Sequence, residues 1–337
     1  MRKKVYIAYT GGTIGMSGAE QGYEPLPGHL EKLMLEIPEL GRPEMPEYDL
    51  HEYNPLLDSS NMRPEDWLRI AADIADNYDR FDGFIVLHGT DTMAYTASAL
   101  AFMLDGLKKP VVFTGSQIPL CEIRNDARDN LITALMLINE YTFPEVCLCF
   151  GSRLLRGCRA KKMDSFGFDA FDSPNFPHLG KLGIDITVRR ELFLPGGTED
   201  FRLNVERIKQ SEVVSLRLFP GISPLILENI LQKPLKGLVL ESYGSGNGPS
   251  RDQKFLHILT RAAERGVVIV NCTQCPRGTV RDDYETGRSL KQAGVISGQD
   301  MTAEAALSKL YCLMQRGIDS EEVKRLMQKN IRGELTA

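Results

Sequence analysis

The segment VYIAYTGGTI at residues 5–14 joins an apolar run to a double-glycine turn that contains Thr13. A second segment, GFIVLHGTDT at residues 83–92, has the same order and places Thr90 in its turn. Each is typical of a buried strand followed by a sharp turn. In an open parallel α/β sheet, ligands bind at the carboxyl ends of the strands. We therefore expect Thr13 and Thr90 to lie across one crevice.

Apolar runs and helical patterns alternate along the rest of this part of the chain. Strands are expected near residues 3–9, 48–53, 83–87, 111–114 and 145–150. Helices are expected between them, near residues 28–37, 64–79, 91–105 and 126–140. The alternation predicts βαβ units and a mostly parallel sheet that is flanked by helices.

Two stretches interrupt the alternation. Residues 16–27, which include Tyr23, are rich in glycine, proline and small side chains. We interpret them as a long loop of the kind that often forms a lid. Residues 151–180 mix glycines with basic and aromatic side chains, and we interpret them as an irregular stretch that contains a hairpin. A short strand is expected near 183–188.

The polar, aperiodic segment PGGTED at residues 195–200 predicts a domain linker. We place an N-terminal catalytic α/β domain at 1–190, the linker at 191–211, and a smaller C-terminal parallel α/β domain at 212–337. In the second domain, strands are expected near 213–218, 236–241 and 267–271, and helices near 223–231, 251–264, 302–316 and 320–329.

The composition limits the class of protein. The chain has 337 residues, of which 42% are hydrophobic and 25% charged, as in a globular protein with a substantial core. Its formal net charge is −5 and it has no long basic run, which gives no support for nucleic-acid or membrane binding. The first residues lack the apolar stretch of a signal peptide, and no segment has the length and hydropathy of a membrane span. We expect a cytoplasmic protein.

The seven cysteines are expected to be reduced thiols, because no secretory signal accompanies them. Cys147 and Cys149 alternate along an apolar strand, so they share a face, whereas Cys272 and Cys275 form a C-x-x-C pair. These spacings do not supply a matched set of zinc ligands. We therefore favour small, buried thiols on strands over a zinc or redox site.

The two threonines suggest nucleophilic chemistry, although local structural roles remain open. Thr13 could cap a tight turn, and Thr90 or Asp91 could be the N-cap of the helix that follows. Alternatively, Asp91 could hold a substrate ammonium group while a threonine hydroxyl meets an electrophile. His88 directly follows a buried strand, and we interpret it as a packed structural histidine.

A threonine hydroxyl is a weak nucleophile and needs a base. The histidines have no obvious triad context, so a lysine is the alternative, since a buried lysine can become neutral. Lys161 and Lys162, in the irregular stretch, are the candidates.

Taken together, the segments at residues 7–15 and 83–93 resemble the two signature segments of the bacterial-type L-asparaginase/glutaminase family. The resemblance covers essentially the whole chain. It extends to LDSS at 57–60, TGSQ at 114–117, FDAF at 168–171, SYGSGN at 242–247 and RGEL at 332–335. The missing signal peptide and the Asp-Ser-Ser segment resemble the cytoplasmic type I branch.

This resemblance implies an amidohydrolase that converts L-asparagine and water to L-aspartate and ammonia by double displacement at a threonine. It assigns Thr13 to one essential position, and Thr90, Asp91 and Lys162 to the second set. It also implies that Tyr23 belongs to a lid that closes over the site. Because the nucleophile is a protein hydroxyl, neither a metal nor an organic cofactor is implied.

The resemblance implies substrate-binding roles as well. Ser59 and Ser60 match residues that hold the α-carboxylate, Asp91 matches the residue that holds the α-ammonium, and Thr90 lies beside it. Asn247 resembles a residue that the neighbouring subunit contributes. A homodimer or homotetramer is therefore expected, with L-asparagine as the small-molecule partner.

Two other functions share these features. The glutaminase-like subunit of a tRNA-dependent amidotransferase has the same core, but it usually carries an extra N-terminal domain, whereas the first strand here starts almost at the first residue. A non-catalytic asparagine sensor would be expected to have lost one of the four residues Thr13, Thr90, Asp91 and Lys162.

Some type I enzymes resemble one another in a second, effector site for asparagine. Cys275 matches one position of that site. However, Glu241 stands where the regulated enzymes have an arginine, and Lys161 where they have a threonine. Because an acidic side chain replaces a carboxylate-binding one, we expect weak or absent activation by L-asparagine.

Overall fold

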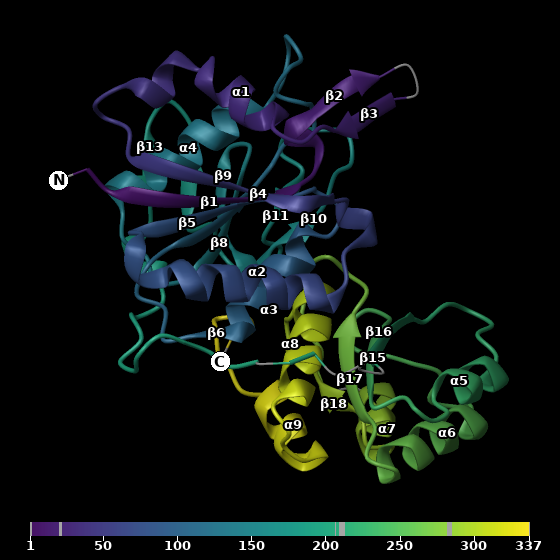
Figure 1. Ribbon diagram of the computed structural model, residues 1–337. Helices are drawn as coiled ribbons and strands as arrows, with labels where there is room; N and C mark the ends of the chain where they lie inside the picture. Colours follow the sequence, from purple (N-terminus) through teal and green to yellow (C-terminus); the bar gives the residue numbers. More distant parts are fainter. Residues whose placement is uncertain (1, 20–21, 206, 209–212, 282–284, 337) are drawn as a thin grey trace. The chain divides into compact units, whose positions relative to one another are not determined.

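The computed structural model describes residues 2–19, 22–205, 207–208, 213–281 and 285–336. The chain divides into two compact units, Met1–Asn204 and Val205–Ala337 (Figure 1). Each is an α/β unit, which confirms the predicted fold class. The linker limits of 191 and 211 stay predictions, and residues 206 and 209–211 of that linker lie outside the described residues.

The main sheet of the first unit consists, among the described residues, of β1 (Lys4–Gly11), β4 (Glu47–Leu57), β5 (Gly83–Leu87), β7 (Val111–Thr114), β8 (Val146–Phe150), β9 (Arg153–Arg156), β12 (Gly180–Leu182) and β13 (Ile186–Val188). Their order across the sheet is β13-β12-β9-β8-β7-β5-β1-β4. The strands from β4 to β8 in this order are parallel. The sheet then continues with antiparallel pairs through β9, β12 and β13. The prediction of a mostly parallel sheet is confirmed.

Helices cover both faces of this sheet. Figure 1 shows α1 (His29–Leu35) and α4 (Ala127–Glu140) on one face, and α2 (Pro64–Asn77) and α3 (Met93–Met103) on the other. Every residue of β5 is buried, as its continuous apolar run requires. Along β1, Val5 and Ile7 point to the same face and pack in one apolar core with Leu30 of α1 and Leu135 of α4.

Helix α2 begins at Pro64, as the prediction of a helix over residues 64–79 requires. Pro64 occupies the first turn, where its missing N–H costs nothing. The Asp66 carboxylate accepts a hydrogen bond of 2.8 Å from the backbone N–H of Arg63, and so satisfies a donor that the helix leaves free.

Residues 16–27 are not a loop throughout, so that prediction was wrong. β2 (Met16–Ala19) and β3 (Gly22–Pro25) pair as an antiparallel hairpin, with Gly18 opposite Tyr23. Glycine and proline lower the strand propensity of this stretch, but its backbone groups still satisfy one another across the hairpin. A second hairpin, β12–β13, replaces the single strand that was expected near 183–188.

Short elements complete the first unit. They are η1 (Thr13–Gly15), η2 (Pro38–Gly41), η3 (Ser59–Asn61), η4 (Tyr78–Arg80), β6 (Leu104–Asp105), η5 (Gly157–Arg159), β10 (Lys161–Lys162), β11 (Phe171–Asp172), η6 (Arg190–Leu192) and β14 (Arg202–Leu203). β10 and β11 pair antiparallel, which confirms the hairpin expected within residues 151–180. β14 pairs with β6, so the end of the first unit is fixed to its own body.

The sheet of the second unit consists of the described strands β15 (Val213–Arg217), β16 (Gly237–Ser242), β17 (Val268–Thr273) and β18 (Ile296–Ser297), in that order and all parallel. Its helices are α5 (Pro224–Ile230), α6 (Gln253–Glu264), α7 (Glu285–Gln292), α8 (Ala303–Gln315) and α9 (Ser320–Met327). Side chains of α5, α6 and α7 form one core, and side chains of α8 and α9 form another. β18 and α7 were not predicted from the sequence, because β18 is very short and α7 is mostly polar and contributes Leu290 to the core.

None of the seven cysteines forms a disulfide. Cys147 and Cys149 lie in the same apolar core, as their alternation predicts. Cys272 is buried whereas Cys275 is exposed, so the C-x-x-C pair spans two environments. Within the described residues, no group of three or more His, Cys, Asp or Glu side chains is placed to hold a metal ion. None of the helices in the described ranges has the length and apolar character that crossing a bilayer requires.

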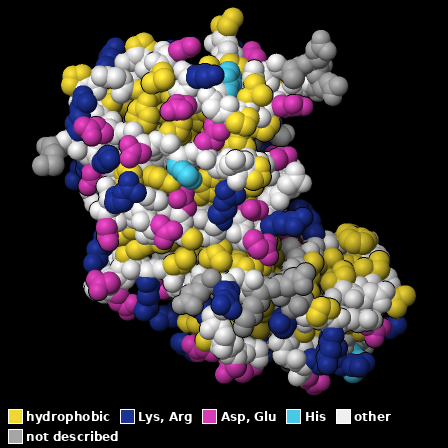
Figure 2. Space-filling view, viewed as in Figure 1, with side chains coloured by type: hydrophobic (Ala, Val, Ile, Leu, Met, Phe, Trp, Pro, Cys, Tyr) yellow, Lys and Arg dark blue, Asp and Glu magenta, His cyan; other side chains and the backbone are white. Residues whose placement is uncertain are grey.

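Charged side chains of both signs are interspersed over the face that Figure 2 shows. Blue basic groups and magenta acidic groups alternate there across both units, without a large field of one sign. This arrangement is typical of a surface that does not attract polyanions.

Candidate active site

The register of the parallel strands brings three turns to one edge of the main sheet. Tyr9 of β1 lies opposite Leu87 of β5, and Leu87 lies opposite Thr114 of β7. The turns that follow these strands therefore leave the sheet at the same level.

The first two turns touch through their glycine backbones. A β-carbon placed on Gly12 would lie 2.5 Å from the backbone nitrogen of Gly89, and Gly12 has a φ of +91°. Both facts require glycine at this position. A β-carbon on Gly89 would in turn lie 2.4 Å from Ser59 Oγ. Thr13 and Thr90 each follow directly after this contact, so the turns meet as expected.

The Thr90 hydroxyl lies beside Lys162 and Asp91. Lys162 Nζ donates to Thr90 Oγ1 at 2.8 Å and to Asp91 Oδ1 at 2.8 Å. Thr90 is buried, whereas the side chains of Lys162 and Asp91 are 22% and 63% exposed. Thr90, Asp91 and Lys162, all predicted for the site, therefore form one cluster. Of the candidate bases Lys161 and Lys162, it is Lys162 that donates to the Thr90 hydroxyl. A lysine, a hydroxyl and a carboxylate at these distances can exchange protons.

Gln117, in the turn after β7, also contacts Thr90. The Thr90 hydroxyl donates to Gln117 Oε1 at 3.3 Å, and Gln117 Nε2 donates to the carbonyl of Gly167 at 3.2 Å. This turn belongs to a segment that resembles the family, but Gln117 was not among the predicted site residues. The signal was available, because a polar residue just after a third buried strand belongs at the same sheet edge.

Ser59 and Ser60 lie in the short helix η3, next to the two turns. The hydroxyl of Thr92 donates to the carbonyl oxygen of Ser59 at 2.7 Å, which ties η3 to the turn after β5. The Ser60 hydroxyl and N–H donate to Asp58 at 2.6 Å and 3.0 Å, and these bonds lower the pKa of the Asp58 carboxyl. Ser59 is buried and Ser60 exposed, so the two hydroxyls differ in access to solvent.

Thr13 and Tyr23 lie on the segment between β1 and α1. Thr13 opens η1 and is half-buried. Tyr23 lies on β3, is 51% exposed, and donates from its hydroxyl to Glu122 Oε1 at 2.9 Å. That hydrogen bond is the largest cause of the raised pKa of Tyr23. Tyr23 is therefore held to Glu122 in this structure, on a hairpin that follows the Thr13 turn.

His88 is structural in this arrangement. It is buried, and burial lowers its pKa to about 4, so the ring is neutral at pH 7. Its Nδ1 lies 2.7 Å from the carbonyl oxygen of Gly89, which identifies Nδ1 as the protonated nitrogen. The interpretation of a packed histidine fits this geometry, since the ring N–H of His88 already donates to the carbonyl oxygen of Gly89.

Asn247 belongs to the second unit, in the turn after β16. Its backbone N–H donates to the carbonyl oxygen of Tyr243 at 2.8 Å, and its side chain is half-buried. Glu241, at the end of β16, accepts a hydrogen bond of 2.9 Å from the Ser215 hydroxyl. Asn247 therefore lies in a different unit from Thr90 and its hydrogen-bond partners.

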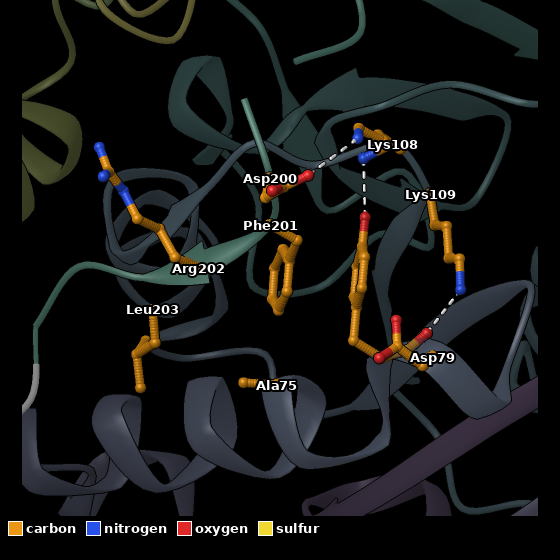
Figure 3. A pocket seen from close by; sticks show the side chains of 9 residues that line it. Ala75, Asp79, Lys108, Lys109, Asp200, Phe201, Arg202 and Leu203 are labelled. Carbon is orange, nitrogen blue, oxygen red and sulfur yellow. Dashed lines mark hydrogen bonds and ion pairs between the residues drawn. The ribbon is translucent and has the colours of Figure 1, made fainter. Parts of the chain in front are cut away.

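A cavity of about 610 Å³ beside α2 lies outside this cluster (Figure 3). Of the described residues that were predicted for the site, none lines it. Its two lysines already have partners: Lys108 lies 3.9 Å from Asp200, and Lys109 donates to the carbonyl oxygen of Tyr78 at 2.6 Å. The rings of Tyr78 and Phe201 stack at 3.6 Å. The stacking fixes the end of the first unit to η4, directly after α2, and we do not place the reaction there.

Comparisons with known proteins agree with this geometry. Residues 4–194 match the family model "Asparaginase, N-terminal", and residues 212–327 match "Glutaminase/Asparaginase C-terminal domain". The chain is 51% identical to L-asparaginase 1 of Escherichia coli K12 over 336 residues, which cover 99% of this chain and 98% of that protein. It is 33% identical to a glutamyl-tRNA(Gln) amidotransferase component of Methanopyrus kandleri, over 98% of this chain and 74% of that protein.

The fold is similar to that of L-asparaginase I from Vibrio cholerae, with a TM-score of 0.93 and 47% identity over the whole of both chains. The chain therefore belongs to the asparaginase family and is an amidohydrolase. Within the family it is more similar to these two type I asparaginases than to the amidotransferase component. The resemblance inferred from the sequence is confirmed.

Proposed function

We propose that the protein hydrolyses L-asparagine to L-aspartate and ammonia at the edge of the main sheet. The observation that carries this proposal is the 2.8 Å contact between Lys162 Nζ and Thr90 Oγ1, next to the place where the backbones of Gly12 and Gly89 touch. It supplies a hydroxyl and a candidate base in one unit, and family membership supplies the substrate class.

In the proposed reaction, Thr13 attacks the side-chain amide carbon of asparagine, and its hydroxyl proton passes through Thr90 to neutral Lys162. The tetrahedral intermediate collapses, its nitrogen takes that proton from Lys162, and ammonia leaves an ester on Thr13. Water then attacks the ester and releases L-aspartate. Thr90 and Lys162 move the protons, the lysine accepting one once it is neutral. Backbone N–H groups of the two turns are suited to stabilise the oxyanion.

Substrate binding is proposed for the residues around this centre. Ser59 and Ser60 would hold the α-carboxylate, and Asp91, the exposed partner of Lys162, would hold the α-ammonium. Tyr23 would leave Glu122 and close over the bound amino acid. We propose that Asn247 comes from a neighbouring subunit, so that the active form is a homodimer or homotetramer.

A cytoplasmic location is proposed as well. It is supported by the seven cysteines, none of which forms a disulfide, since disulfides form and persist in oxidising compartments. Neither alternative function is favoured. The amidotransferase component is the more distant relative, and the retained Thr90–Lys162–Asp91 cluster argues for catalysis over sensing.

The test is ammonia release by the purified protein with L-asparagine, L-glutamine and D-asparagine, together with Thr13→Ala and Thr90→Ala. Fast turnover of L-asparagine that either substitution abolishes is the expected result. L-Glutamine is the critical comparison, because one extra methylene changes specificity by only about 1–3 kcal/mol. A folded protein that releases no ammonia from any of the three would disprove the proposal.

A further inference from the structure

The turn after β7 brings an amide to the Thr90 hydroxyl, and we propose that Gln117 is a positioning residue for the reaction. Thr90 Oγ1 accepts from Lys162 Nζ at 2.8 Å and donates to Gln117 Oε1 at 3.3 Å. The hydroxyl therefore has a donor and an acceptor, and both fix where its oxygen lies. This inference rests on the proposed function, because Gln117 acts through the same hydroxyl.

The orientation of the Gln117 amide group follows from its second hydrogen-bond partner, the carbonyl oxygen of Gly167. Gln117 Nε2 lies 3.2 Å from the carbonyl oxygen of Gly167, which can only accept a hydrogen bond. The NH₂ group must therefore face Gly167, and the amide oxygen must face Thr90. Since that oxygen can only accept, the hydroxyl proton points toward Gln117 and a lone pair faces Lys162.

The backbone of this turn is fixed independently of the Gln117 side chain. The N–H groups of Gln117 and Ile118 both donate to the Asp126 carboxylate at 3.0 Å. Asp126 is 7% exposed, and Asn130 Nδ2 also contacts it at 3.3 Å. Because these bonds use main-chain donors, a change of the Gln117 side chain leaves the path of the turn in place.

These contacts define what Gln117 contributes. With Lys162 and Gln117 both in place, the Thr90 oxygen stays fixed, and only its proton must rotate when the lysine becomes neutral. Without Gln117, the hydroxyl can adopt other rotamers and lose its alignment with Lys162. Misalignment of this kind slows the chemical step, whereas substrate binding, which does not use Gln117, is preserved.

The experiment compares Gln117→Met, which keeps the length but removes the amide, with Gln117→Glu, which keeps an oxygen acceptor. Asn139→Met is the matched control, because the Asn139 amide also donates to a backbone carbonyl, that of Glu44 at 2.9 Å. Steady-state ammonia release from L-asparagine gives kcat and KM for the full-length chain, with each variant measured at its own optimum pH.

We expect Gln117→Met to lower kcat by about ten- to a hundredfold while KM stays within about twofold. Gln117→Glu should recover kcat to within about threefold of the unmodified chain, although it loses the bond to Gly167. Asn139→Met should change neither constant. Should Gln117→Met fail to fold, Gln117→Leu is measured in its place with the same expectation.

Two results would overturn the inference. A kcat for the Met variant within about twofold of the unmodified chain would show that the Thr90 hydroxyl does not need Gln117. Equal losses in the Met and Glu variants would show that Gln117 only ties down the segment around Gly167. An unmodified chain without asparaginase activity would instead refute the proposed function, so the two failures are distinguishable.

Discussion

Lys162 Nζ lies 2.8 Å from Thr90 Oγ1, although the two residues are 72 positions apart in the sequence. The contact joins the turn after β5 to the β10–β11 hairpin, which the chain reaches only after further strands of the main sheet. A lysine and a hydroxyl at hydrogen-bond distance form a candidate catalytic unit that can be tested by removing either member.

Lys162→Met should lower kcat/KM for L-asparagine by about a thousandfold or more, because Thr90 loses the proton acceptor that we propose for it. The fold should survive, since the Lys162 side chain is 22% exposed and its partner Asp91 is 63% exposed. Lys161→Met is the control, and its activity should stay within about threefold of the unmodified chain. Similar losses in both variants would show that charge in this strand, rather than the Thr90 contact, matters.

Gly12→Ala should push the turn after β1 away from the turn after β5, where Gly89 lies. The new β-carbon would lie 2.5 Å from the backbone nitrogen of Gly89, and the φ of +91° is unfavourable for alanine. We expect a destabilisation of about 2–4 kcal/mol and activity at background level. Denaturant unfolding followed by the fluorescence of Trp67, the single tryptophan, measures the first unit. Gly41→Ala, where nothing lies within 4 Å, should be close to neutral; a comparable loss there would contradict the steric argument.

The stability of the first unit should fall as the pH drops from about 6.5 to about 4, because burial lowers the pKa of His88 to about 4. The folded protein resists protonation of this ring, whereas the unfolded chain binds the proton near pH 6.5. The His88 contribution is therefore complete above pH 6.5 and is lost as the pH falls, by about 3 kcal/mol in total.

Unfolding curves of the unmodified chain and of His88→Asn, recorded at about pH 7, 5.5 and 4.5, measure this effect. The difference in unfolding free energy between the two proteins should shrink toward low pH, since the variant has no imidazole to protonate. A difference that is constant across the three pH values would rule out His88 as the titrating group.

Tyr23→Phe should lower kcat by about tenfold or more without a measurable loss of stability, because Tyr23 is 51% exposed and lies on a hairpin. Glu122→Gln removes the negative charge from the partner that holds the Tyr23 hydroxyl in this structure. If that contact belongs only to the open hairpin, Glu122→Gln should keep kcat within about threefold. Equal kcat losses would instead assign Glu122 to the closed site.

Rates plotted against L-asparagine concentration should be hyperbolic, with a Hill coefficient of about 1. Glu241 carries a negative charge where a carboxylate-binding arginine would be needed, and its carboxylate already accepts from Ser215 at 2.9 Å. Glu241→Arg should introduce activation by L-asparagine if the rest of the effector site is present. A sigmoidal curve in the unmodified chain that Glu241→Arg does not sharpen would contradict this reasoning.

Much of the fold was predictable because its signals are local. The continuous apolar run of β5, the proline at the start of α2 and the glycine turn after β1 each depend on a few neighbouring residues. The hairpin of β2 and β3 was not predictable in this way. Its pairing satisfies backbone groups, and the side chains carry almost no alternating pattern.

The candidate site was predictable only in part. The positions of Thr13 and Thr90 after buried strands indicated a shared sheet edge, and the family resemblance selected Lys162 from the candidate pair Lys161 and Lys162. Gln117 was missed, although its place after a third buried strand indicated the same sheet edge; what the sequence did not show was its partner, Thr90. That partner became visible only when the register placed Leu87 beside Thr114.

The sequence by itself determined the βαβ alternation, the two glycine turns and the hydroxyl groups that follow them, because strand burial and turn geometry depend on short-range patterns. Only the tertiary structure decided which distant groups surround Thr90. Lys162 and Gln117 come from separate segments whose meeting depends on the order of strands, the β10–β11 pairing and the Asp126 anchor. A hydrogen bond of about 3 Å forms only when the packed backbone holds both partners at that distance. Distances between residues far apart in the sequence cannot be read from the sequence alone.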